Sequence, residues 1–212
     1  MRLAVIGPQN TGKSTFIKDF IKAFPNYKTP QKTYRDVISK RKLSINQKST
    51  EKNQKIIRDF LYKQISENKQ SNILFDRSVI DNYIYSLALY DKGEASLEFL
   101  NETFDLVMRH LDFLDGVILI PTAASIKLVS DNLRDVDVNY IDKINRYFIK
   151  TLLLINKTRP LEVFVISGTV SYTHLTLPTS TLCSSRWSPY HSKKKQQHNT
   201  ITYTHSYDNQ YI

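Results

Sequence analysis

The residues best suited to chemistry stand near the N-terminus, where positions 7–14 read Gly-Pro-Gln-Asn-Thr-Gly-Lys-Ser. A glycine, four intervening residues and then Gly-Lys-Ser is the spacing typical of loops that hold nucleotide phosphates. The glycines let the backbone curl, so that successive N–H groups point at phosphate oxygens. In such loops the lysine reaches the β- and γ-phosphates of ATP, and the serine hydroxyl ligates Mg²⁺. The residues expected to bind Mg-ATP are Gly7, Asn10, Thr11, Gly12, Lys13, Ser14 and Thr15.

A second candidate is the pair Asp76-Arg77, which follows the apolar run Ile73-Leu74-Phe75. A carboxylate at this place can hold Mg²⁺ through water, or accept the proton of an acceptor hydroxyl. The adjacent arginine can bind an anionic acceptor. The alternative is a surface turn with a local ion pair, and the sequence leaves that alternative open.

Two further arginines are weaker candidates. Arg35 opens an expected helix downstream of Pro30, and we expect it to face the acceptor. Arg134 lies in a polar loop before a long helix, where a lid arginine would contact the transferring phosphate. For both, a solvated surface charge is the alternative. His110 lies on an amphipathic helix and is expected to pack rather than to catalyse.

Alternating strands and helices must position these residues. Short apolar runs predict strands over 3–6, 72–75, 116–120 and 162–166. Helical periodicity predicts helices over 15–24, 34–43, 52–65, 79–90, 97–112, 123–129 and 138–156, with a polar loop over 130–136. This order predicts an α/β fold, a doubly wound parallel sheet covered on both faces. Ligands bind beyond the carboxyl ends of such strands, which is where Gly7 and Asp76 fall.

Composition narrows the class of protein. The chain of 212 residues suits one domain, and no apolar run approaches the roughly 20 residues that span a membrane. The formal charge of +10 raises nucleic acid as a partner, but no basic tract interleaved with aromatics supports it in 1–168, so we do not expect one. The single cysteine, Cys183, and the absence of a signal peptide favour a cytoplasmic location.

The last 44 residues, 169–212, differ from the rest. All five glycines precede this segment, whereas the only Trp and the only Cys lie within it. Residues 169–179 resemble the in-frame translation of a transposase sequencing adapter, and 186–191 resemble its far end. We therefore expect 169–212 to be a disordered, non-native read-through tail and the domain over 1–168 to lack its C-terminal end. A genuine polar tail is the alternative. The domain then holds 26 basic and 19 acidic residues, a charge of +7.

Taken together, these motifs resemble the P-loop kinase group, in particular the small ATPase domains of NadR-type nicotinamide riboside kinases, often labelled AAA domains. The matching segments are 7–14, 30–35, Asp76-Arg77, 131–137 and 163–168. The resemblance implies a P-loop NTPase fold of kinase type. Such families often have a glutamate before the arginine helix, where this chain has Gln31 and Lys32. Thymidylate and deoxynucleoside kinases are similar at the same positions.

We therefore expect an ATP-dependent kinase that transfers the γ-phosphate to a small acceptor: a nucleoside, a nucleotide or nicotinamide riboside. Lys13, Asp76, Arg77 and Arg134 are the expected catalytic residues, Arg35 and Arg77 bind the acceptor, and Ser14 with Asp76 holds Mg²⁺. The alternative is a nucleotide-dependent ATPase or switch acting on a protein or lipid partner. The sequence does not indicate an oligomeric state.

Overall fold

The computed structural model describes residues 1–122, 137–166 and 175–176. The chain divides into two compact units, Met1–Pro178 and Thr179–Ile212, and every described residue belongs to the first. The helix expected over 123–129, the polar loop over 130–136, and with it Arg134, lie outside the described residues. So does the segment 169–212 apart from 175–176, and the prediction of a non-native tail stays a prediction.

The strands of the first unit form one sheet in the order β2-β1-β3-β4-β5. The strands are β1 Arg2–Ile6, β2 Ile73–Asp76, β3 Gly116–Leu119, β4 Val163–Ile166 and β5 Leu175–Thr176. The first four are parallel, which confirms the predicted parallel sheet. The short strand β5 pairs with β4 in the antiparallel direction, which was not predicted. Its connection, residues 167–174, is shorter than the dozen or so residues that a parallel crossover needs.

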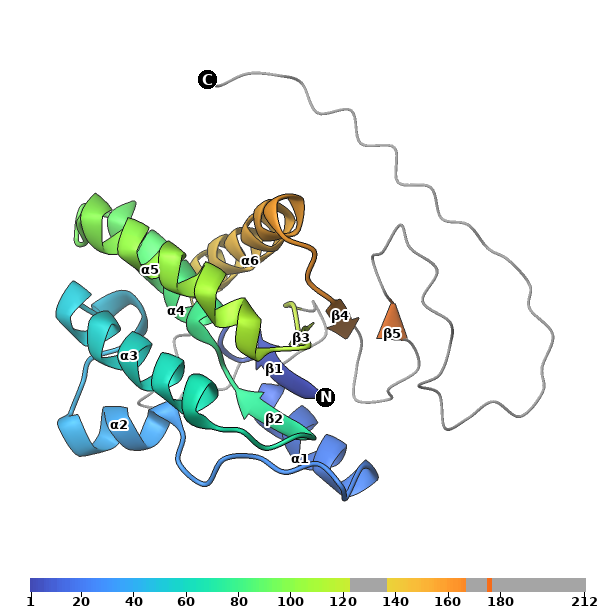
Figure 1. Cartoon of the computed structure of the whole chain (residues 1–212). Helices are drawn as coiled ribbons and strands as arrows, with labels where there is room; N and C mark the ends of the chain where they lie inside the picture. Colours follow the sequence, from blue (N-terminus) through green and yellow to red (C-terminus); the bar gives the residue numbers. More distant parts are fainter. Residues whose placement is uncertain (123–136, 167–174, 177–212) are drawn as a thin grey trace. The chain divides into compact units, whose positions relative to one another are not determined.

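Helices fill the intervals between the four parallel strands (Figure 1). The α-helices are α1 Lys13–Ala23, α2 Tyr34–Arg41, α3 Glu51–Glu67, α4 Val79–Tyr90, α5 Leu97–His110 and α6 Val138–Thr158. Two 3₁₀ turns, η1 Asn46–Lys48 and η2 Leu111–Phe113, complete the set among the described residues. Each helix predicted within this part of the chain is confirmed, with ends shifted by up to two residues. The η1 turn was not predicted.

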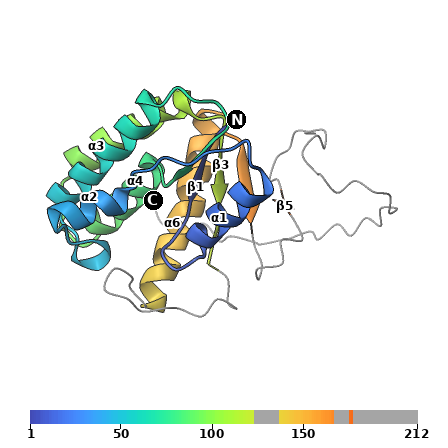
Figure 2. The same ribbon diagram turned by 90° about the horizontal axis from the view of Figure 1, so that it is seen from below.

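The two faces of the sheet carry two separate apolar cores. Because side chains alternate along a strand, Leu3 and Val5 of β1 pack on the α1 side, whereas Ala4 and Ile6 pack on the opposite side. The α1 side is the smaller core, and Figure 1 shows α1 beyond β2, away from α4, α5 and α6, whereas Figure 2 views the molecule from the α1 side. The larger core includes buried residues of α2 to α6. Both faces are covered, as the doubly wound prediction requires.

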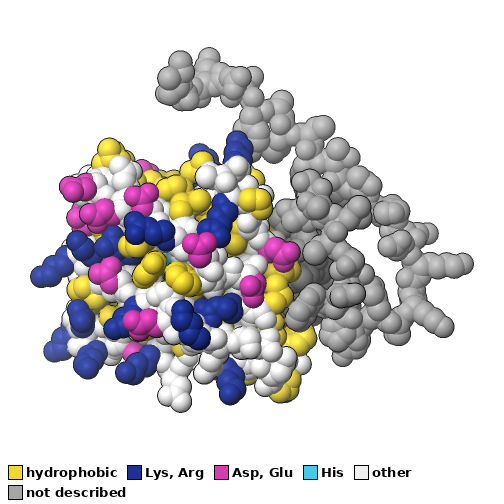
Figure 3. All heavy atoms as spheres, viewed as in Figure 1, with side chains coloured by type: hydrophobic (Ala, Val, Ile, Leu, Met, Phe, Trp, Pro, Cys, Tyr) yellow, Lys and Arg dark blue, Asp and Glu magenta, His cyan; other side chains and the backbone are white. Residues whose placement is uncertain are grey.

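Pairing between strands brings the candidate residues to one edge. Val5 of β1 is in register with Asp76 of β2, and the Arg77 amide donates to the Val5 carbonyl at 3.0 Å. Gly7, which follows β1, and Asp76 therefore meet at the carboxyl edge of the sheet. On the face drawn in Figure 3, basic and acidic side chains are interspersed. None of the described helices combines the length and the apolar character that crossing a membrane requires.

Candidate nucleotide-binding site

The turn after β1 requires glycine at position 7. Gly7 has a φ of 140°, and a Cβ placed on it would lie 2.3 Å from the carbonyl oxygen of Ile120. Any side chain would therefore collide with the backbone that follows β3. Gly12, with a φ of 82°, adopts a second left-handed conformation where the loop enters α1. The glycine spacing of the predicted phosphate loop thus has a direct backbone cause at both ends.

The phosphate loop leads directly into the N-terminus of α1. Gly12 is the N-cap residue, no side chain caps the helix, and its first turn contains no acidic residue. The first N–H groups of a helix have no intrahelical acceptor, and the helix dipole makes this end positive. Ser14 and Thr15 lie in this first turn, where they were predicted. This end of α1 is suited to bind phosphate.

Lys13 is folded against its own loop. Its side chain is buried, and its ammonium donates to the carbonyl oxygen of Pro8 and, at 3.0 Å, to the hydroxyl oxygen of Thr11. Burial lowers the pKa of Lys13 well below its ordinary value, and the nearby positive charge of Arg77 acts in the same direction. Two carboxylates in reach, those of Asp81 and Asp76, oppose this shift.

Arg77 clamps the loop from the side of β2. Its guanidinium Nη1 donates to the Gly7 carbonyl and to Asp81 Oδ1, both at 2.7 Å. Arg77 is only 7% exposed, and its φ of 79° is a left-handed conformation that is unfavourable for a non-glycine residue. The structure therefore places Arg77 within the loop's support, whereas the sequence favoured contact with an acceptor. These contacts leave the acceptor role a prediction.

Asp81 completes this clamp, and the sequence analysis missed it. Its carboxylate accepts from the Gly7 amide at 3.3 Å, from Arg77, and from the Ser78 amide at 3.0 Å. Burial raises the pKa of Asp81, while the Arg77 guanidinium and the Lys13 ammonium oppose the shift. Asp81 Oδ1 also forms an ion pair with the Arg77 guanidinium. The capping-box spacing from Ser78 to Asp81, visible in the sequence, signals the local bond but not the bond to Gly7.

Arg35 reaches the loop from α2. Its Nη2 donates to Ser14 Oγ at 3.2 Å, and its charge lies near enough to Lys13 to lower the pKa of that lysine. Asp76 lies at the end of β2, and its negative charge opposes this effect by raising the pKa of Lys13. The structure thus brings Arg35, Asp76 and Arg77 into one charged cluster around Lys13. In the loop itself, Asn10 has a φ of 61°.

Two tyrosines and a glutamine border this cluster. The Arg77 guanidinium lies over the rings of Tyr34 and Tyr85, with centroid distances of 5.5 and 5.7 Å. The Tyr85 hydroxyl donates to Gln9 Oε1 at 2.7 Å, so α4 is tied directly to the phosphate loop. Neither tyrosine was predicted, because nothing local in the sequence relates α2 and α4 to position 9.

The oxygen atoms available suit Mg²⁺ held jointly with a nucleotide. Among the described residues no three His, Cys, Asp or Glu side chains form a metal-binding group. Mg²⁺ commonly takes one or two protein oxygen ligands, and phosphates and water supply the rest. Ser14 Oγ and the Asp76 carboxylate belong to the same cluster and are of that type. The residues present therefore fit Mg²⁺ with a bound nucleotide, rather than a metal cage made of protein alone.

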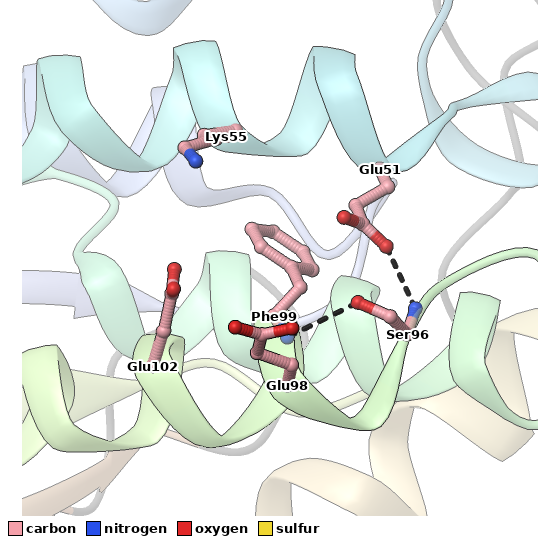
Figure 4. A pocket seen from close by; sticks show the side chains of 6 residues that line it. All are labelled: Glu51, Lys55, Ser96, Glu98, Phe99 and Glu102. Atoms are coloured by element: carbon pink, nitrogen blue, oxygen red, sulfur yellow. Dashed lines mark hydrogen bonds between the residues drawn. The ribbon is translucent and has the colours of Figure 1, made fainter.

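A separate pocket lies between α3 and α5 (Figure 4). It has a volume of about 210 Å³, and carboxylates from both helices line it together with Lys55 and the Phe99 ring. Glu51 accepts from the Ser96 amide at 2.7 Å, and the Ser96 hydroxyl accepts from the Phe99 amide. The first bond joins the start of α3 to the N-cap residue of α5, and the second caps α5 itself. None of the residues predicted for phosphate chemistry lines this pocket.

The fold and the loop define the class of protein: this is the nucleotide-binding fold of P-loop kinases. The model of a family described as an AAA domain matches residues 2–171, and the chain belongs to that family. A comparison with curated proteins gave no match.

Solved structures of kinase type are similar to this chain. A NadR protein in complex with NR is 14% identical with a TM-score of 0.61, covering 82% of this chain and 47% of the NadR chain. Deoxyadenosine kinase from M. mycoides with products dCMP and dCDP is 20% identical with a TM-score of 0.57, covering 79% and 90%. The same enzyme with dATP is 19% identical with a TM-score of 0.55. This chain thus spans about half of the NadR protein and most of the deoxyadenosine kinase.

Proposed function

We propose that this protein is an ATP-dependent phosphotransferase that moves the γ-phosphate of ATP to a small acceptor. The acceptor is a nucleoside, a nucleotide or nicotinamide riboside. One observation carries the proposal: Lys13 of the phosphate loop shares a single cluster with Asp76, Arg77 and Arg35 at the carboxyl edge of the sheet. Phosphoryl transfer depends mostly on positioning and on neutralising charge, and this cluster supplies both.

Each residue of the cluster has a role in this proposal. Lys13 neutralises the β- and γ-phosphates, and Ser14 with Asp76 holds Mg²⁺, which adds further positive charge. Asp76 also accepts the proton of the acceptor hydroxyl. Arg35 binds the acceptor, and Arg134 contacts the transferring phosphate. Arg77 holds the loop through Gly7 and stabilises the charge that develops during transfer.

The similar solved structures support a small acceptor, since one contains NR and another dCMP and dCDP. At 14 to 20% identity they show the fold alone, so the choice among these acceptors rests on experiment. Because this chain spans 47% of the NadR protein, no activity of that whole protein is carried over.

The alternative is an ATPase or switch that acts on a protein or lipid partner. One observation favours it: Arg77, expected to contact an acceptor, is buried against Gly7 and Asp81. An arginine engaged in this way supports the loop whether or not an acceptor binds. In that case phosphate is transferred to water alone.

ADP release from Mg-ATP by the full chain distinguishes the two functions. The protein is tested with nucleosides, deoxynucleoside monophosphates and nicotinamide riboside, beside Lys13→Ala and the matched control Lys18→Ala, an exposed lysine of the same helix. A kinase releases ADP faster with one acceptor, which becomes phosphorylated. Release that ignores every acceptor but requires Lys13 indicates the ATPase or switch. Release that persists in Lys13→Ala overturns both.

A further inference from the structure

Gln9 is a buried polar residue inside the phosphate loop that the proposed mechanism does not use. Its side chain is 5% exposed, and Oε1 accepts from the Tyr85 hydroxyl. Its amide nitrogen Nε2 is buried and has no hydrogen-bond partner among the residues that the structure describes. A buried donor without an acceptor is costly, and native proteins retain few of them. Such a group within a loop suited to phosphate calls for an acceptor from a ligand.

The orientation of this amide follows from its neighbours. Burial raises the pKa of Tyr85 to about 12, so the hydroxyl keeps its proton at neutral pH and can donate it. The only acceptor on the Gln9 side chain is Oε1, and therefore Nε2 is the end left over. Arg77 lies over the Tyr85 ring and is itself bonded to Asp81. The groups that hold the loop at Gly7 thus also fix the direction of Gln9.

The place of Gln9 indicates which phosphate it serves. The Lys13 ammonium, which is expected to reach the β- and γ-phosphates, contacts the carbonyl of Pro8, the residue next to Gln9. Gln9 is also tied to α4, whose first turn contains Asp81 of the charged cluster. We propose that Gln9 Nε2 donates to an oxygen of the γ-phosphate and so selects ATP over ADP. This inference rests on the proposed function, because it takes the loop to be an ATP site.

Equilibrium binding separates this role from general support of the loop. Titration calorimetry with Mg-ADP and with a Mg-bound non-hydrolysable ATP analogue requires no acceptor and no turnover. A hydrogen bond to a charged group is lost in Gln9→Ala, so the analogue binds about tenfold more weakly. ADP, which lacks the γ-phosphate, changes by less than about twofold. Gln9→Glu keeps an oxygen for Tyr85 but sets a negative charge against the phosphate, so it weakens the analogue more than Gln9→Ala does.

Two further variants complete the test. Tyr85→Phe removes the hydroxyl that orients the amide, and combined with Gln9→Ala it adds little to the loss of selectivity for the analogue. Gln70→Ala, an exposed glutamine before β2, is the matched control and binds both nucleotides as the original chain does. Equal weakening of analogue and ADP, or no change in either, overturns the role of Gln9. Failure of the original chain to bind either nucleotide instead overturns the proposed function.

Discussion

The two edges of the sheet each contain an arginine that clamps backbone, and they differ in what surrounds it. At the amino edge, Arg2 donates to four carbonyl oxygens at 2.5 to 3.0 Å, those of Ile65, Asn68, Gln70 and Phe113. These bonds tie the end of α3 and the η2 turn to β1. At the carboxyl edge, Arg77 bonds one carbonyl and one buried carboxylate, with the Lys13 ammonium nearby.

This difference indicates that Arg2 supports the structure at the amino edge, whereas Arg77 belongs to a binding site at the carboxyl edge. Carbonyls satisfy the Arg2 guanidinium without bringing a second charge into the interior. The carboxyl edge instead concentrates charges of both signs in a buried place, which is unfavourable unless they are paired or meet a charged ligand. Left-handed backbone occurs at both edges, at Asn72 before β2 and at Arg77 after it, but it is more unfavourable for arginine than for asparagine. Perturbed groups of this kind gather where ligands bind.

Asp81→Asn is expected to have the largest effect. The change leaves Arg77 buried without its charge partner and puts an N–H group where the carboxylate accepts from the Gly7 and Ser78 amides. Removing one member of a buried ion pair costs about 3–5 kcal/mol of the free energy of unfolding. Urea denaturation measures this loss, and calorimetry with Mg-ATP is expected to show weakened binding as the loop loses its clamp. A variant with unchanged stability and unchanged ATP affinity would contradict the clamp.

Arg2→Met tests the other half of the comparison with a smaller effect. Methionine keeps an apolar stem beside the Phe75 ring, over which the Arg2 guanidinium lies at 5.6 Å, but removes the four bonds. Because water replaces some of these bonds at this partly exposed position, we expect a loss of about 2 kcal/mol in the free energy of unfolding. Affinity for Mg-ATP should be unchanged in the folded protein. Reduced affinity would show that the two edges are coupled, and the contrast between them would fail.

Much of the fold could be predicted because its signals are local. Apolar runs and helical stripes predicted the first four strands and the helices to within a few residues, and the alternation of strand and helix predicted that these strands run parallel. The strand β5 was missed because Leu175 and Thr176 are part of a segment without periodicity. Its partner, β4, lies beyond a connection too short for a crossover.

In the candidate site, too, only the features with a local signal in the sequence were predicted. The phosphate loop is contiguous, so its spacing alone identifies it, and Asp76 follows from its place at a strand end. Asp81, Tyr85 and Gln9 were missed because they meet only through the packing of α4 on the loop, across more than 70 residues of chain. For the same reason the sequence could not show that Arg77 is engaged by Gly7.

The smallest expected effect concerns His110 and depends on pH. This residue packs beside Tyr62 at the end of α5, fully buried, as the sequence predicted, and neither ring nitrogen has a partner among the described residues. Burial lowers the pKa of His110 to about 3 from its ordinary 6.5, and the positive charge of Arg2 acts in the same direction. Below pH 6.5 the unfolded chain therefore binds a proton that the folded protein excludes.

This linkage has a definite sign. The contribution of His110 to stability is fully present above pH 6.5 and is lost as the pH falls from 6.5 towards 3, by up to about 1.4 kcal/mol per pH unit. His110→Phe removes the proton site while filling a similar volume, so its free energy of unfolding should fall less between about pH 7 and about pH 5.5, by roughly 1 kcal/mol. Urea denaturation of both proteins at the two pH values measures the difference. If the free energy of unfolding fell equally in both proteins, the folded protein would accept a proton at His110. The interior beside Arg2 would then tolerate a second positive charge.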